Sequence, residues 1–283
     1  MCGRFVITSP PAALREMFGY IEQPNFPPRY NVAPTQPIPV VLLQNGGRHF
    51  QLMRWGLIPS WVKDPRTFSL LINARSETVR EKPAFKNAIK RRRALIPADG
   101  YYEWQDAGGR KRPFFIHRRD GHPLAFAALA ETWMGPNGEE QDTVAIVTAP
   151  ASPDLAQLHH RVPVTIRPEQ FARWLDCLPN DVDDVMPMLK GPDVGEFAWH
   201  QVTMRVNAVA NDDAQLLLPM SAEEIAAEDA PAPKKVAARK APVPEDDGGV
   251  WMDGYAFTDA TPSISISIFG LGSATTTQVV RAG

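Results

Sequence analysis

The feature that most constrains the fold of this chain is a series of short β-branched and aromatic runs separated by turn signals. Two of these signals, each between two apolar runs, are Asn45-Gly46-Gly47 and Asp120-Gly121. Such turn residues between apolar runs indicate antiparallel hairpins. The chain has no regular alternation of strands and helices and no internal repeat. We therefore predict an α+β fold with a curved, largely antiparallel, barrel-like sheet and flanking helices.

The composition of the 283-residue chain changes near residue 221. From there to residue 249, Ala, Pro, Lys and acidic residues dominate, which is typical of disorder or of a linker. The alternating run over residues 263–268 is too short and isolated to form a domain. We expect a single domain over residues 2–220 and a low-complexity, disordered tail over residues 221–283.

Composition also excludes several protein classes. No apolar run approaches the roughly 20 residues that a membrane span needs, and the N-terminus lacks the apolar core of a signal peptide. The two cysteines, Cys2 and Cys177, argue against a disulfide framework and against a structural zinc site. We expect a cytoplasmic monomer that needs no membrane, no metal and no cofactor.

The charge of the chain is unevenly distributed, although its formal net charge is only −2. Residues 1–119 hold 20 Lys and Arg against 8 Asp and Glu, a balance of +12, and the remainder holds 10 against 24, a balance of −14. A basic half in a near-neutral protein is typical of a polyanion-binding surface. A solvated basic face without a ligand is the alternative.

Cys2 directly follows the initiator Met1. We expect aminopeptidase to remove Met1, which would leave Cys2 with a free α-amine beside its thiol. The reference pKa values of these groups, about 7.7–8.0 and about 8.5, leave both partly deprotonated near neutral pH. A 1,2-aminothiol reacts with an aldehyde, first as an imine and then as a five-membered thiazolidine. The alternative is an incidental Cys on a frayed terminus.

Four further residues are candidates for chemistry or for binding. An apolar run delivers Asn73 and Arg75 at its end, as a scaffold presents site residues. Glu103 stands between two aromatic residues, and desolvation by these would raise the pKa of its carboxyl and suit it to act as an acid. An outward-facing Glu on an alternating strand is the alternative. His159 lies at the end of a short predicted helix. The alternative to a catalytic role is a structural His at that helix end.

Aromatic and basic residues outside these positions also allow two interpretations. Trp55 and Trp61 share a Pro- and Gly-containing loop, so they either pack in the core or stack on bases. Residues 83–93 are predicted to be helical and end in four cations, residues 90–93. Cations in a last turn complement the helix dipole, but four exceed what capping needs, so they could instead face phosphates.

Taken together, six motifs resemble the SOS response-associated peptidase (SRAP) family over roughly residues 2–220. The resemblance implies a single α+β domain that binds abasic (AP) sites in single-stranded DNA covalently through its N-terminal Cys. The motifs are Met1-Cys2-Gly3-Arg4-Phe5, Tyr30-Asn31-Val32-Ala33-Pro34, Trp55-Gly56, Asn73-Ala74-Arg75, Gly100-Tyr101-Tyr102-Glu103-Trp104 and His159-His160-Arg161-Val162-Pro163.

The same resemblance assigns roles to individual residues, and it implies association with the nucleoid when the protein is bound to DNA. The catalytic set comprises Cys2, Asn73, Glu103 and His159. His160 stands where the family often has an acidic residue. The DNA-binding set comprises Arg4, Pro34, Trp55, Trp61, Arg75 and Arg161, with Arg4 and Arg75 as phosphate contacts.

Two other functions compete with AP-site cross-linking. One is an N-terminal-nucleophile peptidase in which Cys2 attacks peptide bonds and its own amine is the base. The other is a non-catalytic single-strand-binding protein that uses only its basic half and its Trp loop. The cross-linking hypothesis also allows strand cleavage at the AP site and autocatalytic removal of Met1. Of the three functions, only AP-site cross-linking predicts a covalent adduct with AP-site DNA.

The first testable prediction concerns maturation of the N-terminus. Closure of a thiazolidine requires a free α-amine beside the thiol, so active protein should lack Met1. Intact-mass spectrometry of the purified protein should show this loss. Full cross-linking by protein that retains Met1 would contradict the mechanism.

Overall fold

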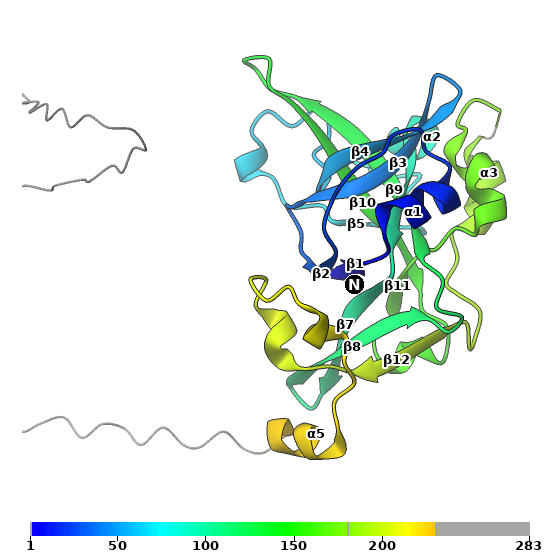
Figure 1. The fold of residues 1–283 in the computed structure, drawn as a ribbon. Coiled ribbons are helices and arrows are strands. Elements are labelled where there is room, and N and C mark those ends of the chain that lie inside the picture. The colour runs from blue at the N-terminus through cyan, green and yellow to red at the C-terminus, as the bar shows by residue number, and fades with distance from the viewer. Residues whose placement is uncertain (1, 180, 230–283) are drawn as a thin grey trace, which may run out of the picture. The chain divides into compact units, whose positions relative to one another are not determined.

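The computed structural model describes residues 2–179 and 181–229. Within these residues, the strands form two sheets, and short helices lie around them (Figure 1). In Figure 1, β3, β4, β9 and β10 occupy the upper part of the molecule and β7, β8 and β12 the lower part, with β1 between them. None of the described helices is long and apolar enough to cross a membrane.

Five strands close into a barrel in the order β10–β4–β3–β6–β9, because β9 pairs with β10 as well as with β6. Every neighbouring pair in this barrel is antiparallel except β4 and β10, which are parallel. The prediction of an α+β fold with a largely antiparallel, barrel-like sheet is confirmed. The barrel strands are β3 (Pro37–Gln44), β4 (Gly47–Trp55), β6 (Arg93–Ala98), β9 (Leu124–Met134) and β10 (Glu140–Pro150).

Two short strands extend the barrel beside the C-terminal half of β10. β5 (Asn73–Arg75) pairs with it in parallel, and β11 (Arg161–Pro163) pairs with it antiparallel. Thr148 is opposite Arg75 in one pairing and opposite Pro163 in the other. Segments that are nearly 90 residues apart in sequence therefore meet on the two sides of one strand.

The second sheet has the order β12–β8–β7–β1–β2 and carries the N-terminal segment near its centre. Gly100 permits the close approach of its strands, because a Cβ there would lie 2.5 Å from the ring of Phe115 and 2.7 Å from the carbonyl oxygen of Ile116. The strands are β1 (Phe5–Ile7), β2 (Arg29–Val32), β7 (Gly100–Ala107), β8 (Arg110–Arg118) and β12 (Phe197–Gln201).

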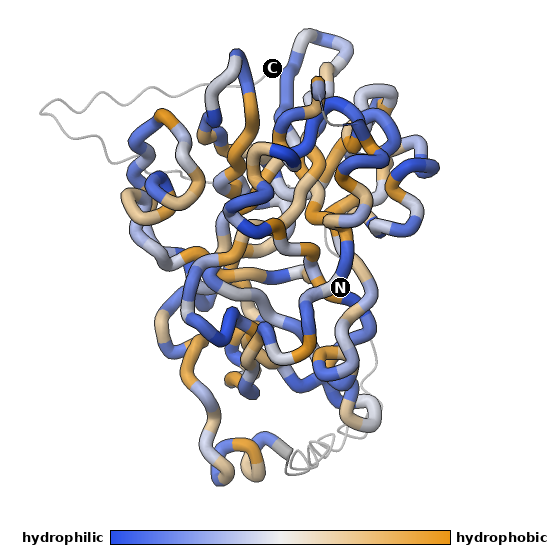
Figure 2. Tube along the Cα trace, turned by 90° about the vertical axis from the view of Figure 1, so that its right-hand side faces the viewer, coloured by the Kyte–Doolittle hydropathy of each residue, from blue (hydrophilic) through white to orange (hydrophobic). Residues whose placement is uncertain are grey.

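Helices cover only parts of the sheets, and hydrophobic residues are concentrated along the interior strands (Figure 2). The segment predicted to be helical over residues 83–93 is an α-helix only over Ala88–Arg91 and is preceded by hydrogen-bonded turns. Residues 222–229, inside the predicted tail, are helical, and residues 230–283 of that tail lie outside the described residues. The helices are α1 (Pro11–Phe18), α2 (Ala88–Arg91), α3 (Phe171–Leu175), α4 (Val182–Val185) and α5 (Ala222–Asp229).

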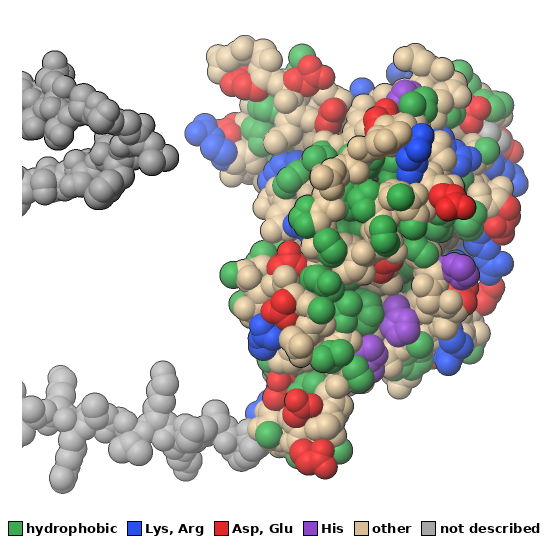
Figure 3. Space-filling view, in the orientation of Figure 1, with side chains coloured by type: hydrophobic (Ala, Val, Ile, Leu, Met, Phe, Trp, Pro, Cys, Tyr) green, Lys and Arg blue, Asp and Glu red, His purple; other side chains and the backbone are tan. Residues whose placement is uncertain are grey.

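The basic first half and the acidic remainder of the chain do not form separate bodies. β8 from the first half pairs with β12 from the second, and β6 pairs with β9 in the same way. On the face drawn in Figure 3, Lys and Arg side chains are accordingly intermixed with Asp and Glu. A basic surface must therefore be identified from local groups of cations and not from the charge of the half-chains.

Candidate functional site

Cys2 is anchored in the body of the protein. The residues that follow it form β1, and the backbone amide of Tyr102 donates to the carbonyl oxygen of Arg4 at 2.9 Å. The side chain of Cys2 is fully buried and forms no disulfide. Its carbonyl oxygen accepts a 2.8 Å hydrogen bond from Nδ2 of Asn73. Cys2 is therefore not part of a frayed terminus.

Asn73 reaches Cys2 because β5 pairs with β10, where Asn73 lies opposite Ile146. Its amide nitrogen is engaged by Cys2, whereas its Oδ1 is buried and accepts no hydrogen bond from the described residues. A buried acceptor without a donor is costly to maintain. Asn73 thus retains one hydrogen-bonding position next to Cys2 that an incoming donor can use.

Glu103 projects from β7 and is only 4% exposed. Its aromatic neighbours do not share its side of the strand, because alternate residues point to opposite faces. The hydroxyl of Tyr102 donates to the carbonyl oxygen of Tyr30, and Nε1 of Trp104 donates to Asn207. The burial of Glu103 therefore comes from the protein interior and not from the aromatic residues beside it in sequence.

The carboxylate of Glu103 acts on both Cys2 and His159. Burial raises the pKa of the Cys2 thiol, and the negative charge of Glu103 adds to that increase. Burial lowers the pKa of the His159 imidazole, and Glu103 opposes that decrease. Glu103 therefore lies within electrostatic reach of both Cys2 and His159, although the three residues come from separate segments.

His159 is held in a defined orientation between the short 3-10 helix η2 (Leu155–Gln157) and β11. Nδ1 of His159 lies 3.0 Å from the backbone amide nitrogen of Arg161 and 3.2 Å from its carbonyl oxygen, so the backbone of Arg161 fixes the orientation of the ring. His160 stacks on it with ring centroids 4.3 Å apart and is itself exposed to solvent. The inner position of the pair belongs to His159, which is the imidazole that the sequence favours.

Arg4 is fixed by a residue for which sequence reasoning predicted no role. Its Nη1 donates to Oδ1 of Asn31 at 2.7 Å and to the carbonyl oxygen of Val206 at 2.8 Å. Asn31 is itself buried and donates through Nδ2 to three backbone carbonyl oxygens. The guanidinium of Arg4 also lies over the Trp104 ring, 5.9 Å from its centroid. Asn31 was visible in sequence only as part of a motif.

Arg161 is buried and engaged within the protein. Its guanidinium donates to both carboxylate oxygens of Glu77, at 2.6 and 2.9 Å, and to the carbonyl oxygen of Thr148 at 2.6 Å. A phosphate at Arg161 would therefore have to compete with Glu77. The proximity of these residues could not be inferred from sequence, because Glu77 and Arg161 are 84 residues apart and meet only through β10.

The other predicted DNA contacts differ in exposure. Trp55 is fully buried, and its Nε1 donates to the carbonyl oxygen of Ile72, so its geometry fits core packing and not base stacking. Trp61 is 58% exposed, and Pro34 is partly exposed. Arg75 is exposed, and no hydrogen bond or ion pair joins its side chain to another described residue.

Tyr101 is a buried residue near the site that sequence analysis did not single out. Its hydroxyl is buried and has no hydrogen-bond partner among the described residues. Burial raises the pKa of this hydroxyl, and the charges of Cys2 and Glu103 add to the increase. Because Tyr101 lies two positions before Glu103 on β7, both side chains point to the same face of the strand. This two-residue spacing in a predicted strand could have indicated from sequence that Tyr101 lies beside Glu103.

The residues described by the structure offer no candidate metal centre. Among residues 2–179 and 181–229, no group of three or more His, Cys, Asp or Glu side chains could hold a metal ion.

Comparison with known proteins links this geometry to a family. A family model described as SOS response associated peptidase (SRAP) matches residues 1–209. The abasic site processing protein YoqW of Bacillus subtilis is 34% identical over 221 residues, which cover 77% of this chain and 99% of that protein. YedK of Escherichia coli is 34% identical, covering 68% and 85% of the two chains. HMCES of Gallus gallus, also named an abasic site processing protein, is 31% identical, covering 78% of each.

Solved structures share the fold. A Bacteroides thetaiotaomicron protein matches with a TM-score of 0.69 at 23% identity, covering 78% of this chain and all of that one. A phage-related protein from Bordetella bronchiseptica matches with a TM-score of 0.58 at 31% identity, covering 71% and 94% of the two chains.

The ion pair between Glu77 and Arg161 generates a prediction about pH. Hydrogen bonds from Arg161 hold the pKa of the Glu77 carboxyl at about 2, below its ordinary value of about 4.3. The pair therefore stabilises the fold above about pH 4.3, and this contribution is lost as the pH falls toward about 2. Glu77→Gln should lower the free energy of unfolding near neutral pH by about 1–2 kcal/mol, a modest cost because solvent screens a partly exposed carboxylate.

Urea denaturation of wild type and Glu77→Gln near neutral pH and near pH 3 measures this contribution. The difference between them should shrink at the lower pH. Glu81→Gln is the matched control, because Glu81 is exposed and forms no ion pair with a described residue. An equal deficit for Glu77→Gln at both pH values would show that the pair does not carry the effect.

Proposed function

This chain belongs to the SOS response-associated peptidase family, and we propose that it processes abasic sites in single-stranded DNA by forming a covalent bond through Cys2. The relatives named abasic site processing proteins support this substrate. The observation that carries the proposal is the position of Cys2, which is buried, accepts a hydrogen bond from Asn73 and lies within electrostatic reach of Glu103, as His159 does.

The proposed reaction joins one aminothiol to one aldehyde. An abasic deoxyribose is in equilibrium with a ring-opened form that carries an aldehyde at C1′. The free α-amine of Cys2 attacks C1′, and the resulting carbinolamine loses water to give an imine. The thiol then adds to C1′ and transfers its proton to nitrogen, which closes a thiazolidine. One water molecule is released, and no oxidant or cofactor is consumed.

The side chains around Cys2 fit separate roles in these steps. Glu103 acts as the general acid at the sugar ring oxygen and at the departing hydroxyl. Asn73 orients the amine through a hydrogen bond, a role suited to its free Oδ1. His159 relays protons at the sugar oxygens and assists reopening of the ring. The low pKa of its imidazole keeps it neutral, and therefore able to accept a proton, near neutral pH.

We further propose that the DNA enters across Arg4, Arg75, Trp61 and Pro34. The exposed guanidinium of Arg75 suits a phosphate, and the exposed indole of Trp61 suits a base. Arg161 would support this path by holding β10 and the Glu77 turn together, or would exchange Glu77 for a phosphate on binding.

Two further activities could arise at the same site. The imine acidifies the hydrogen at C2′, so strand cleavage by β-elimination competes with ring closure. The family description also names peptidase activity, and release of Met1 from Cys2 is the peptide cleavage that this N-terminus offers. A thiazolidine suppresses the first of these because it removes the imine.

Replacement of the thiol tests the cross-link. Wild-type protein mixed with an AP-site oligonucleotide should give a covalent adduct on a denaturing gel, and Cys2→Ser should give no stable adduct because an oxazolidine reverts readily. The amine remains in Cys2→Ser, so borohydride should trap an imine, and strand cleavage should rise. If wild type forms no adduct, the proposed function is wrong. If Cys2→Ser gives no trappable imine, the amine is not the first nucleophile.

Replacement of Glu103 and of each His tests the proton transfers. Glu103→Gln keeps the shape of the side chain and removes its acid, so adduct formation should slow by about 10²–10⁴ with little change in DNA affinity. His159→Ala should slow adduct formation, and its larger effect should be on reversal, whereas His160→Ala is the matched control and should be mild.

Single-turnover time courses of adduct formation, chased with excess unlabelled AP-site DNA, measure both directions of the reaction. A wild-type rate for Glu103→Gln would mean that the acid lies elsewhere. Greater damage by His160→Ala than by His159→Ala would reverse the assignment of the imidazoles.

A further inference from the structure

A row of lysines lies along the segment that precedes and enters α2. Lys82, Lys86 and Lys90 are spaced four residues apart, and the backbone amide of Lys86 donates to the carbonyl oxygen of Lys82 at 3.0 Å. Residues at this spacing in helical backbone lie on one face. All three lysines are exposed, as is Arg91, which follows them. We call this group the basic row; it comprises Lys82, Lys86, Lys90 and Arg91.

The opposite face of the same segment is fixed in the core. Phe85, Ala88 and Ile89 are buried in the main hydrophobic cluster. The backbone amide of Ile89 donates to the carbonyl oxygen of Phe85 at 2.9 Å, and that of Arg92 donates to the carbonyl oxygen of Ala88 at 2.8 Å. Because these contacts set the rotation of the segment, the basic row must face outward and cannot turn to find partners elsewhere.

The cations that flank the basic row are neutralised within the protein. Arg80 pairs with Asp183, and Arg92 pairs with Glu131 and donates to Thr132. Arg93 is buried and donates to backbone carbonyl oxygens, one of them that of Asp176. The four consecutive cations of residues 90–93 therefore have two roles: residues 90 and 91 belong to the basic row, and residues 92 and 93 are structural.

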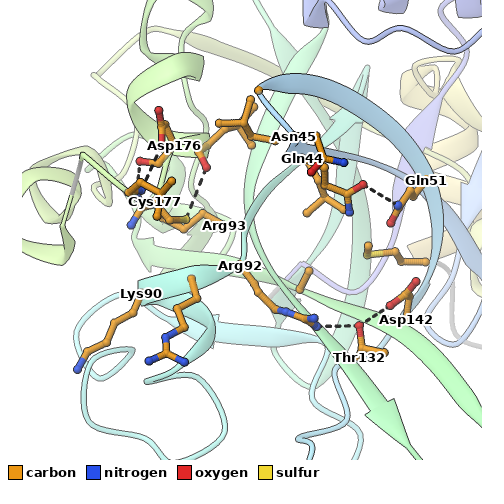
Figure 4. A pocket seen from close by; sticks show the side chains of 18 of the residues that line it. Gln44, Asn45, Gln51, Lys90, Arg92, Arg93, Thr132, Asp142, Asp176 and Cys177 are labelled. Atoms are coloured by element: carbon orange, nitrogen blue, oxygen red, sulfur yellow. Dashed lines mark hydrogen bonds between the residues drawn. The ribbon is translucent and has the colours of Figure 1, made fainter.

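Figure 4 shows this division at a cavity of about 780 Å³ that the end of the barrel contributes to. Arg92 points toward Thr132 and Asp142, and Arg93 lies beside Asp176, whereas Lys90 points away from both groups. The cavity is lined by acids as well as by cations. Lys90 and Arg91 of the basic row also line this cavity, but its acids make it poorly suited to an anion.

No ion pair or hydrogen bond joins a side chain of the basic row to any other residue in the described part of the chain. Like charges four residues apart in a helix repel one another and destabilise it. Glu81, directly before Lys82, is the one exposed acid among residues 81–91, so the four cations of the row exceed the acids beside them and form a local concentration of positive charge that a bound anion would offset. The regular four-residue spacing of the lysines along one side of the segment suits a linear polyanion better than a compact one.

The position of the row relates it to the proposed site. The chain runs from Arg75 on β5, beside Asn73, through the basic row to Arg93 at the start of β6. β6 then returns over six residues, about 20 Å, to Ala98, and the next residue, Asp99, donates its backbone amide to the carbonyl oxygen of Val6 in β1. The segment therefore leads away from the neighbourhood of Cys2 toward the opposite end of β6.

We propose that the basic row binds the sugar-phosphate backbone of DNA flanking the abasic site, as a second set of phosphate contacts beyond Arg4 and Arg75. This inference rests on the proposed function, because it takes the DNA at Cys2 as its starting point. The flanking DNA is either the continuing single strand or a duplex arm, since both present the same phosphates. The row supplies affinity and direction but takes no part in the chemistry.

The test neutralises the row and compares it with an equal change elsewhere. Lys86→Gln/Lys90→Gln removes two charges from the row, and Arg15→Gln/Arg173→Gln removes two exposed charges outside it that likewise have no ion pair within the described residues. Each is titrated in a salt series with an AP-site oligonucleotide that has short flanks, one with long single-stranded flanks and one with a duplex arm. Reduction of the AP sites beforehand prevents covalent capture, and circular dichroism verifies that each variant is folded.

With long flanks or a duplex arm, the row variant should bind more weakly than wild type and than the control. Its log–log salt slope should be shallower by about 0.7 per lost contact on a single strand or about 0.9 on a duplex. The substrate on which the row variant binds more weakly identifies whether the row contacts single-stranded or duplex DNA. On short flanks the row variant should match the control, and at saturating unreduced AP-site DNA it should cross-link at the wild-type rate.

Equal affinity and equal salt slope for the two double variants on both extended substrates would overturn the proposal. Failure of wild type to form any adduct would overturn the proposed function instead, and the salt series on reduced substrates would still report on the row. The two outcomes are therefore distinguishable.

Discussion

The site depends on the pairing of β1 with β7. A chain terminus is ordinarily the most mobile part of a protein, but here Phe5 and Val6 pair with Tyr101 and Gly100 within a five-stranded sheet. That pairing anchors the segment that holds Cys2, the second residue of the chain, and Cys2 is fully buried. It also determines which face of β7 is directed toward Cys2, because alternation along a strand links the orientation of Glu103 to that of Tyr101.

The remaining site residues are brought together by β10. This strand contributes its first half to the closed barrel and its second half to pairings with β5 and β11. Asn73 reaches Cys2 from one side of β10, and β11 on the other side fixes Arg161, whose backbone amide orients His159. A rigid barrel thus supports a site whose members come from four distant parts of the chain, as precise positioning requires.

Burial divides the arginines of the site into two groups. Arg161 is surrounded by Glu77 and Thr148 and stabilises the edge of the barrel, whereas Arg75 remains exposed. Arg4 is intermediate, since Asn31 holds one end of its guanidinium and Trp104 lies beneath it. The same division recurs among residues 90–93. Arg92 and Arg93 contact other residues of the protein, whereas the side chain of Lys90 has no such partner among the described residues. Positive charge alone does not distinguish a structural cation from a DNA-binding one. The distinction comes from whether the protein supplies a hydrogen-bond or ion-pair partner.

The sequence by itself determined the fold class and the chemical character of the N-terminus. Turn signals between short apolar runs are local, and the aminothiol of a terminal Cys is a property of one residue, so neither needed knowledge of distant contacts. The tertiary structure decided that the barrel closes through β9 and β10, that Trp55 belongs to the core and that Glu77 occupies Arg161. It also decided that Glu103 is buried by the interior and not by Tyr102 or Trp104, which face the other way. These outcomes depend on pairing between segments far apart in sequence, and a local pattern carries no information about which distant segment will supply the partner.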